Sequence, residues 1–385
     1  MLIQRAISPF ILNMAKEYPA LSIIGPRQSG KTTLSKMLFP DHSYVNLEEP
    51  DIRDFAQKYP RDFLKSYSGN LIIDEVQRVP ELLSYIQVIT DEKNQKGQFI
   101  LTGSHQPQIK ASITQSLAGR TAVITLLPLS IQELSGAGIV LERDEYIFRG
   151  FMPRIYSENI SPKHLYQNYY ATYVERDVKQ LINVGNQISF ERFIKLLAGR
   201  IGQIVNLNAL ASDAGVSQTT LTSWLSVLEA SFIVFRLPCY FNNFGKRVIK
   251  APKLFFTDAG LAASLLGIET AGQVFRDPLA GGLFECMVVT EALKSMYNRG
   301  KNPGLYYFRN QNGLEVDLII SKGRDLIPIE IKSGLTFDSS FKKNLQQFRK
   351  LSEDIKSGYV VYGGDKRVKM EDTEFINYRD IASIL

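Results

Sequence analysis

The chain carries, at residues 25–32, the stretch Gly25-Pro26-Arg27-Gln28-Ser29-Gly30-Lys31-Thr32. This stretch fits the pattern G-x-x-x-x-G-K-[ST], in which backbone N–H groups cradle phosphate groups. The apolar run Leu21–Ile24 precedes it, and the residues from Thr33 onward continue as a predicted helix. A strand that leads through such a loop into a helix places the positive helix N-terminus against an anion. The stretch therefore predicts a phosphate-binding loop in a parallel α/β sheet.

Two side chains within this loop have predicted roles toward a nucleoside triphosphate. Lys31 would reach the β- and γ-phosphates, and the hydroxyl of Thr32 would ligate Mg²⁺. Residues 25–33 make up the predicted nucleotide-binding loop, and we expect ATP with Mg²⁺ as its ligand. The choice between ATP and GTP is left open.

Two carboxylates follow the next buried strand, in which Leu71–Ile73 leads into Asp74 and Glu75. In P-loop enzymes the first carboxylate at such a position holds Mg²⁺, and an adjacent glutamate can polarise the attacking water as a general base. We therefore expect Asp74 to join Thr32 in holding the metal and Glu75 to be the base for hydrolysis.

Other polar residues are candidates for sensing or contacting phosphate. The run Phe99–Leu101 leads into Thr102 and Ser104, either of which could sense the γ-phosphate, and Ser104 is included in the predicted nucleotide site. An ordinary turn is the alternative for both hydroxyls. Arg120 could contact phosphate in the same molecule or in a neighbouring one, and a surface salt bridge is its alternative.

The order of the motifs resembles that of a family of prokaryotic AAA-type ATPases that carry a C-terminal domain of unknown function. Besides the loop, the resemblance rests on Ile72–Gln77, Leu101–Ser104, Ser116–Arg120, Leu127–Ser130, Gly150–Pro153, Glu175–Asp177, Lys250–Leu254 and Phe256–Leu261. Two positions depart from the family pattern: Phe151 stands where a second glycine is usual, and His105 replaces a more usual polar residue.

The composition bounds the class of protein. Hydrophobic residues make up 44% and charged residues 22%, as in soluble globular proteins, and 385 residues suggest two or three domains. No run approaches the roughly 18 apolar residues of a membrane span. The two cysteines lack metal-ligand spacing, and no signal-peptide pattern is seen, so we expect a cytoplasmic protein without membrane contact. A net charge of +6 weakly indicates a polyanionic partner.

Residues 207–228 have the pattern of a helix-turn-helix. Gly215 supplies the turn, Ser217 caps the second helix, and apolar residues at helical spacing form its buried face. The apolar run Phe232–Leu237 would start a wing that Leu254–Phe256 closes. These features predict a winged helix.

The segment between Glu229 and Asp258 contains no acidic residue. It contains five cations, namely Arg236, Lys246, Arg247, Lys250 and Lys253. Cations without a counter-charge suit phosphate contacts, so DNA is a candidate partner. The second helix offers few side chains for reading base edges beyond Gln218, Thr219 and Ser223. A lid or an oligomerisation surface is the alternative role for this domain.

Charged side chains pair on two strands near the C-terminus. Strand alternation puts Glu315 and Asp317 on one face of the first strand, and Glu330 and Lys332 on one face of the next. A carboxylate followed by Glu-x-Lys on the adjacent strand resembles the PD-(D/E)xK nuclease superfamily.

That resemblance implies roles for four residues. Asp317 and Glu330 would hold Mg²⁺ or Mn²⁺, Lys332 would position or activate the hydrolytic water, and Glu285 on a preceding helix would be an accessory. A domain that keeps the fold and only binds is the alternative. Pro328 argues mildly against a fully paired central strand.

The expected fold class is α/β with three domains. A P-loop, AAA-like parallel sheet would occupy residues 1–150, a helical winged-helix domain 151–257, and a nuclease-like α/β domain 258–385. We expect the strands of the first sheet at Ala20–Ile24, Ser43–Asn46, Leu71–Asp74, Phe99–Thr102 and Ala122–Leu126.

Together these features predict a magnesium-dependent ATPase that is coupled to nucleic acid through its winged-helix and nuclease-like domains. The alternative is an ATP-gated switch or adaptor whose C-terminal domain binds without catalysis. A small-molecule kinase is disfavoured because no acceptor-site motif accompanies the P-loop. Oligomerisation and the physiological substrate are left open.

Overall fold

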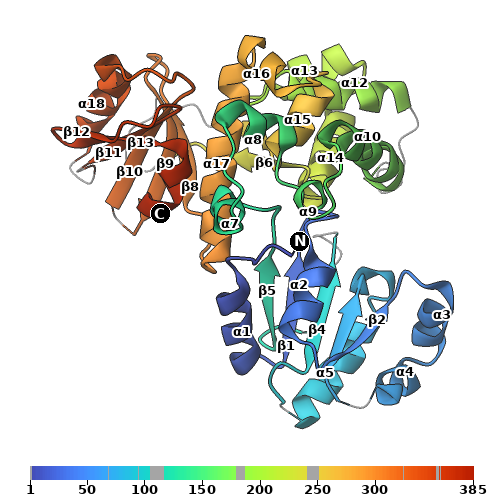
Figure 1. Ribbon diagram of the computed structural model, residues 1–385. Coiled ribbons are helices and arrows are strands. Elements are labelled where there is room, and N and C mark those ends of the chain that lie inside the picture. Colours follow the sequence, from blue (N-terminus) through green and yellow to red (C-terminus); the bar gives the residue numbers. More distant parts are fainter. Residues whose placement is uncertain are drawn as a thin grey trace.

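The computed structural model describes residues 2–67, 69–93, 95–104, 117–178, 187–240, 251–323, 325–352, 355 and 357–385. They form a parallel sheet, a helical unit and a second sheet, with the long helix α17 (Ala280–Asn298) at the centre (Figure 1). Within these ranges, no helix is both long and apolar enough to cross a membrane.

The first unit is a five-stranded parallel sheet with the order β2-β3-β4-β1-β5. Its strands are β1 (Ala20–Ile24), β2 (Ser43–Asn46), β3 (Leu71–Asp74), β4 (Phe99–Gly103) and β5 (Thr121–Thr125). Its helices are α1 (Ser8–Glu17), α2 (Lys31–Leu38), α3 (Pro50–Lys58), α4 (Pro60–Ser66) and α5 (Leu82–Lys93), with a 3₁₀ turn at Val76–Arg78. The five predicted strands are confirmed to within one residue.

Strand alternation explains how this sheet is covered on both faces. On one face, Leu21 and Ile23 of β1 pack in one cluster with Leu34 of α2. On the other face, Ile24 belongs to the cluster that contains Ile86 of α5. Since both faces are buried, the strands read as continuous apolar runs rather than as alternating ones.

Helices make up most of the second unit. They are α7 (Ile131–Gly136), α8 (Arg143–Arg149), α9 (Pro153–Ser157), α10 (Pro162–Tyr169), a π-helical segment (Tyr170–Val178), α12 (Gln187–Ala198), α13 (Leu207–Ala214), α14 (Gln218–Ala230), α15 (Ala259–Leu265) and α16 (Ala271–Arg276). Both α15 and α16 pack against α8, although the sequence placed residues from 258 onward with the C-terminal domain.

The two helices of the expected helix-turn-helix are present as α13 and α14. Gly215 ends α13 with a φ of +72°, a conformation that glycine adopts at little cost. Ser217 caps α14 by accepting a hydrogen bond from the backbone N–H of Thr220 at 3.1 Å. An antiparallel pair of strands, β6 (Val234–Leu237) and β7 (Lys253–Phe256), follows. The identification of this arrangement as a winged helix stays a proposal.

The C-terminal unit is a six-stranded mixed sheet with the order β12-β13-β11-β10-β9-β8. Its strands are β8 (Leu305–Arg309), β9 (Glu315–Lys322), β10 (Asp325–Lys332), β11 (Gly358–Tyr362), β12 (Val368–Met370) and β13 (Thr373–Asn377), and α18 (Lys343–Arg349) joins β10 to β11. Pro328 pairs with Ile319 of β9 and lies just before the first β11 pair, Ile329 with Tyr359. The proline therefore does not prevent β10 from pairing on both sides.

An irregularity in β9 lies where the charged residues are found. Tyr306 of β8 pairs with Ile319, and Phe308 pairs with Val316. Over this interval β9 has one residue more than β8, as in a β-bulge, which re-aims side chains locally. Asp317 lies within the interval.

Helix α17 is buried around most of its circumference because elements of the middle and C-terminal units pack on it. Strands β7 and β10, helices α8 and α15, and the C-terminal 3₁₀ segment Tyr378–Ile384 contact it. Such a helix is expected to be apolar all round, so the charged residues Glu291 and Lys294 in its buried part require partners.

Candidate functional site

The phosphate-binding loop joins β1 to α2 at the carboxyl edge of the first sheet. A Cβ atom at Gly25 would collide with the carbonyl oxygen of Leu126, so only glycine fits there. Gly30, immediately before α2, has a φ of +91°, in the left-handed region that favours glycine. Both glycines of the pattern are thus required by the geometry of the loop.

Lys31 is buried beneath the loop. Its Nζ donates hydrogen bonds to the carbonyl oxygens of Gly25, at 3.1 Å, and Pro26, at 2.8 Å. Burial lowers the pKa of Lys31 to about 8, although the carboxylates of Glu75 and Asp74 act in the opposite direction. Because burial destabilises the charged form of this ammonium group, an anion that binds beside it would stabilise that form.

Asp74, at the end of β3, is the polar centre of this edge. Its Oδ2 accepts hydrogen bonds from the hydroxyl of Thr32, at 2.7 Å, and from that of Tyr44, at 3.0 Å. Its Oδ1 accepts a hydrogen bond from the hydroxyl of Thr102. Thr102, on β4, is thus placed between the P-loop strand and the Asp74 strand.

Two polar side chains hold Glu75 at the same carboxyl edge of the sheet. Its backbone adopts a φ of 54°, which is uncommon for a non-glycine residue. Its carboxylate accepts hydrogen bonds from the amide of Gln77 and from the Ser104 hydroxyl, the latter at 3.1 Å. Ser104 therefore contacts the predicted base, and Thr102 contacts the predicted metal ligand. His105 lies outside the described residues.

A pocket of about 420 Å³ adjoins the loop. Lys31, Thr32 and Glu75 line it, and so do apolar residues that the sequence did not assign to a site, namely Leu2, Ile3, Met37 and Pro153. The pocket combines these apolar side chains with further charged ones, namely Arg5, Arg27, Glu48, Arg154 and Glu158. Such a mixture suits a ligand with a phosphate tail and a flat organic part.

Arg120 lies at the opposite edge of the sheet. Strand β5 runs parallel to β1, and Ala20 donates a backbone hydrogen bond to the Arg120 carbonyl at 3.3 Å. At roughly 3.3 Å per residue, β1 separates this position from the loop by more than about 13 Å. The prediction of a phosphate contact within the same molecule is wrong, and the Arg120 guanidinium instead pairs with Asp91 at the surface. A contact with a neighbour's phosphate remains a prediction.

Comparison with known proteins places these features in a family. A family model of the AAA domain matches residues 17–135, and two domains of unknown function match residues 141–272 (DUF8612) and 280–381 (DUF4143). Uncharacterized proteins of Mycobacterium tuberculosis and Mycobacterium bovis are each 30% identical over 362 residues, which cover 92% of this chain and 79% of theirs. The chain belongs to the family of these mycobacterial proteins. Its N-terminal unit is an AAA-type P-loop ATPase domain.

Solved structures show more distant likenesses. A Walker-type ATPase of Pyrococcus abyssi aligns with 14% identity and a TM-score of 0.45, covering 67% of this chain and 94% of that one. RuvB of Thermotoga maritima aligns with 18% identity and a TM-score of 0.30, covering 61% and 90%. At these values the likeness adds no argument about function.

Arg5 is a residue beside the phosphate loop that sequence reasoning missed. Its guanidinium is buried and donates to the carbonyl oxygens of Ser29 in the phosphate loop, at 2.8 Å, and of Leu127, at 2.6 Å. Its Nε donates to Glu133 at 3.0 Å. A lone arginine near the N-terminus carries no sequence pattern, so only the fold reveals that it fixes the loop.

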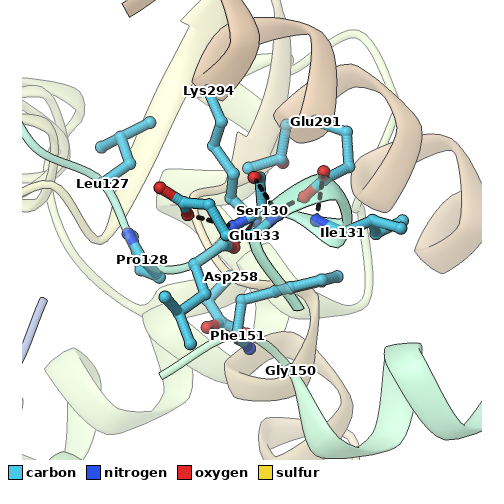
Figure 2. Close-up of polar contacts among 12 residues, drawn as sticks. Leu127, Pro128, Ser130, Ile131, Glu133, Gly150, Phe151, Asp258, Glu291 and Lys294 are labelled. Carbon is cyan, nitrogen blue, oxygen red and sulfur yellow. Dashed lines mark hydrogen bonds and ion pairs between the residues drawn. The ribbon is translucent and has the colours of Figure 1, made fainter. Parts of the chain in front are cut away.

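A buried ion pair on α17 forms hydrogen bonds with the segment that follows the AAA sheet (Figure 2). Lys294 Nζ donates to Glu291 at 2.7 Å and to the Leu129 carbonyl at 2.8 Å. The other oxygen of Glu291 accepts the backbone N–H of Ile131 at 2.7 Å. The Lys294 ammonium also lies 3.6 Å from the centre of the Phe151 ring.

Asp258 ties the segment around Gly150 and Phe151 to the start of α15 in the same region (Figure 2). It accepts the backbone N–H groups of Phe151, at 2.9 Å, and Gly260, at 2.8 Å, and the hydroxyl of Tyr166. Gly150 packs so closely against Tyr166 and Asp258 that a Cβ atom would collide with both. The Gly-x-x-Pro and Thr-Asp-Ala-Gly motifs therefore meet at a structural contact.

The structure corrects the prediction of five cations without counter-charges. Arg236 donates to Glu229 at 2.6 Å, and Lys253 is buried beside carboxylates of α17 and β9. The prediction counted acidic residues only within the segment, whereas folding brings acidic partners from elsewhere. Lys246, Arg247 and Lys250 lie outside the described residues.

The three residues predicted at the C-terminal site come together. Lys332 Nζ lies 2.6 Å from Glu330 Oε1 and 3.6 Å from Asp317 Oδ2. Asp317 also accepts the backbone N–H of Ile331 at 2.8 Å, and Glu330 accepts from the Asn344 amide at 3.2 Å. Burial, and then the nearby Asp317 carboxylate, raise the pKa of Glu330 to about 7.

Lys253 of β7 enters this cluster from the middle unit, which the sequence did not predict. Its Nζ lies 2.8 Å from Glu285, 2.6 Å from Glu315 and 3.8 Å from Asp317. Burial and the Asp317 carboxylate raise the pKa of Glu285 to about 8. A lysine directly before the apolar run Leu254–Phe256 was the signal that the sequence offered.

As arranged, the residues of the cluster do not fit a divalent cation. Ammonium groups contact the oxygens that a metal would require, and no group of three or more His, Cys, Asp or Glu side chains suited to a metal is found in the described part of the chain. The cluster is a network of ion pairs in this structure.

The first prediction concerns the buried pair on α17. Lys294→Ala leaves the Glu291 carboxylate buried without its charge partner, which should cost about 3–5 kcal/mol. We expect a clearly lower urea midpoint by circular dichroism, partly restored in the double variant Glu291→Gln/Lys294→Met. Lys301→Ala, which removes an exposed lysine just beyond the helix, is the control. An unchanged midpoint for Lys294→Ala would show that the pair does not hold the units together.

The second prediction concerns pH. Glu330 keeps its proton in the folded protein up to about pH 7, whereas its ordinary pKa is 4.5. Its stabilising contribution is therefore complete below about pH 4.5 and is lost as the pH rises through 7. We expect the melting temperature to fall between pH 5 and pH 8, and Glu330→Gln to flatten that fall. Substitution of the exposed Glu92 by glutamine should leave the profile unchanged, and an equal slope in both variants would contradict the assignment.

Proposed function

We propose that the AAA domain binds ATP with magnesium and hydrolyses it. The observation that carries this proposal is the convergence of Lys31, Thr32, Asp74 and Glu75 at one edge of the parallel sheet, beside a pocket of suitable composition. Lys31 and Thr32 begin α2, which follows β1, whereas Asp74 and Glu75 lie at the end of β3, and β4 separates these two strands in the sheet. Their proximity is thus a product of the fold.

The loop and Lys31 bind the phosphates in this proposal. The Lys31 ammonium turns from the carbonyl oxygens of the loop to the phosphate oxygens, exchanging neutral acceptors for charged ones. The contact between the Thr32 hydroxyl and Asp74 Oδ2 puts two oxygen donors at one point, which fits Mg²⁺. When bound, the metal would supply neutralisation of the phosphate charge.

Glu75 takes the role of the general base. Hydrogen bonds from Ser104 and Gln77 hold its carboxylate and orient it. It accepts a proton from the attacking water, a contribution that is typically worth about 10²–10⁴-fold in rate. The hydrogen bond from Ser104 makes that residue a positioning residue for the base.

The third prediction tests this proposal directly. Lys31→Ala should nearly abolish ATP binding in an equilibrium fluorescence assay, because the cation that faces the β- and γ-phosphates is removed. Glu75→Gln should bind ATP like the wild type but hydrolyse it at least about 100-fold more slowly. The controls Lys16→Ala and Glu81→Gln change exposed residues of the same domain. Wild-type hydrolysis by Glu75→Gln would remove Glu75 as the base.

We also propose that the middle and C-terminal units couple the ATPase domain to nucleic acid. Three observations support this: the exposed face of α14 is polar and uncharged, the segment 241–250 adds three cations, and the C-terminal unit has the order helix, three strands, helix, strand. An ATP-gated adaptor, whose C-terminal unit binds a protein, is the alternative.

The fourth prediction addresses the nucleic-acid proposal. Replacing Lys246, Arg247 and Lys250 by alanine should weaken DNA binding similarly for all sequences. The salt slope should become shallower by roughly 0.9 for each DNA phosphate that the variant no longer neutralises. ATP binding should persist. The control removes three exposed lysines of the AAA domain, Lys16, Lys65 and Lys93. Equal affinity and slope in the two triple variants would favour a lid or assembly role.

A further inference from the structure

We propose that Lys253 is the resident cation of the C-terminal carboxylate cluster and that it closes this cluster to divalent metal ions. The inference rests on the proposal that the C-terminal unit helps to couple the ATPase domain to nucleic acid, and on its resemblance in sequence to nucleases, and it adds a regulation of metal binding. Lys253 belongs to β7 of the middle unit, where it pairs with Leu237 of β6. The contact by which Lys253 closes the cluster, called the lock below, therefore joins the middle unit to the C-terminal unit.

The position of the ammonium group supports this proposal. The Lys253 side chain is only 3% exposed, and its Nζ lies 2.8 Å from Glu285 of α17 and 2.6 Å from Glu315 of β9. Asp317 completes the set at 3.8 Å. Two carboxylates within hydrogen-bond distance, and a third nearby, surround the ammonium as they would surround a small cation.

The charge balance explains why the lysine and a metal would exclude each other. Four carboxylates meet in the cluster, from Glu285, Glu315, Asp317 and Glu330, and the described cations that contact them come from Lys253, Lys332 and Arg309. With Lys253 in place, three described cations face the four carboxyl groups. A divalent cation would need the same oxygens and would be repelled by the ammonium beside them.

A second observation shows that the cluster retains an unused acceptor. Glu330 is 3% exposed, and its Oε2 is buried without a hydrogen-bond partner in the described part of the chain. Its other oxygen is engaged by Lys332 and Asn344. A buried carboxyl oxygen without a partner is costly. Asp317 links Glu330 to the Lys253 side of the cluster, because it lies 3.6 Å from Lys332 Nζ and 3.8 Å from Lys253 Nζ.

The lock also connects the middle unit with α17 and the C-terminal sheet, which are distant from Lys253 in the sequence. Lys253 follows the basic segment 241–250 and lies on the strand pair after the helix-turn-helix, whereas its partners lie on α17 and β9. Any ligand that draws β7 away from α17 would uncover the carboxylates and create a strong local negative charge. Metal binding at the cluster is thereby made conditional on the position of the middle unit.

Manganese titration tests the proposal on the full chain, without nucleotide, by isothermal titration calorimetry and by the electron paramagnetic resonance of free Mn²⁺. The wild type and Lys253→Arg, which keeps the cation, should show only weak background binding. Lys253→Met should bind one additional Mn²⁺ at least about tenfold more tightly than that background. Lys253→Met/Asp317→Asn should return to the background.

Folding is checked in each variant by the far-ultraviolet spectrum and by ATP binding, and Lys253→Gln serves as a second neutral variant if Lys253→Met does not fold. If the wild type binds Mn²⁺ tightly and Asp317→Asn removes that binding, the lock is refuted, although a metal site at the cluster is supported. A folded Lys253→Met or Lys253→Gln protein without added binding would overturn both the lock and the metal site.

Discussion

The buried ion pair of Glu291 and Lys294 is the constraint that joins the central helix α17 to the segment leaving the AAA sheet. The pair lies on α17, and it engages the Leu129 carbonyl and the Ile131 N–H at the exit of the AAA sheet. Burying two charges is costly unless each is paired and hydrogen-bonded, and here both conditions are met. The same segment reaches the phosphate loop through Glu133 and Arg5. One continuous polar network thus runs from the loop to the central helix.

This network lies close to the C-terminal cluster as well. Glu285 and Glu291 are on the same helix, six residues apart, which corresponds to about 9 Å along the axis. The nucleotide edge and the carboxylate cluster are therefore both attached to α17, from different sides. A rigid helix shared by two sites gives a physical route by which a change at one could alter the other. The contacts supply the route, and only measured coupling would show its use.

The two candidate sites differ in how they treat charge. At the nucleotide edge, Lys31 is buried against neutral carbonyl groups, and the Glu75 and Asp74 carboxylates offset its desolvation only in part until an anion arrives. At the C-terminal cluster, carboxylates and lysines neutralise each other almost completely. The first arrangement is ready for an anion, whereas lysines already fill the cation positions of the second, in which Glu330 Oε2 alone has no hydrogen-bond partner among the described buried carboxyl oxygens of the cluster. This contrast is why the same reasoning supports ligand binding in the AAA domain and a closed state in the C-terminal unit.

The sequence by itself determined the phosphate loop, the five strands around it and the pairing of Asp74 with Glu75, because those features are set by local periodicity and by spacing within a single motif. It also placed Asp317, Glu330 and Lys332 on adjacent strands, since alternation with period two decides their faces. Only the tertiary structure decided the roles of Arg5, Arg120 and Lys253. Their partners lie far away in the chain. Long-range packing fixes the edge of the sheet at which a residue lies and the cation that fills a cluster, and no local pattern encodes that packing.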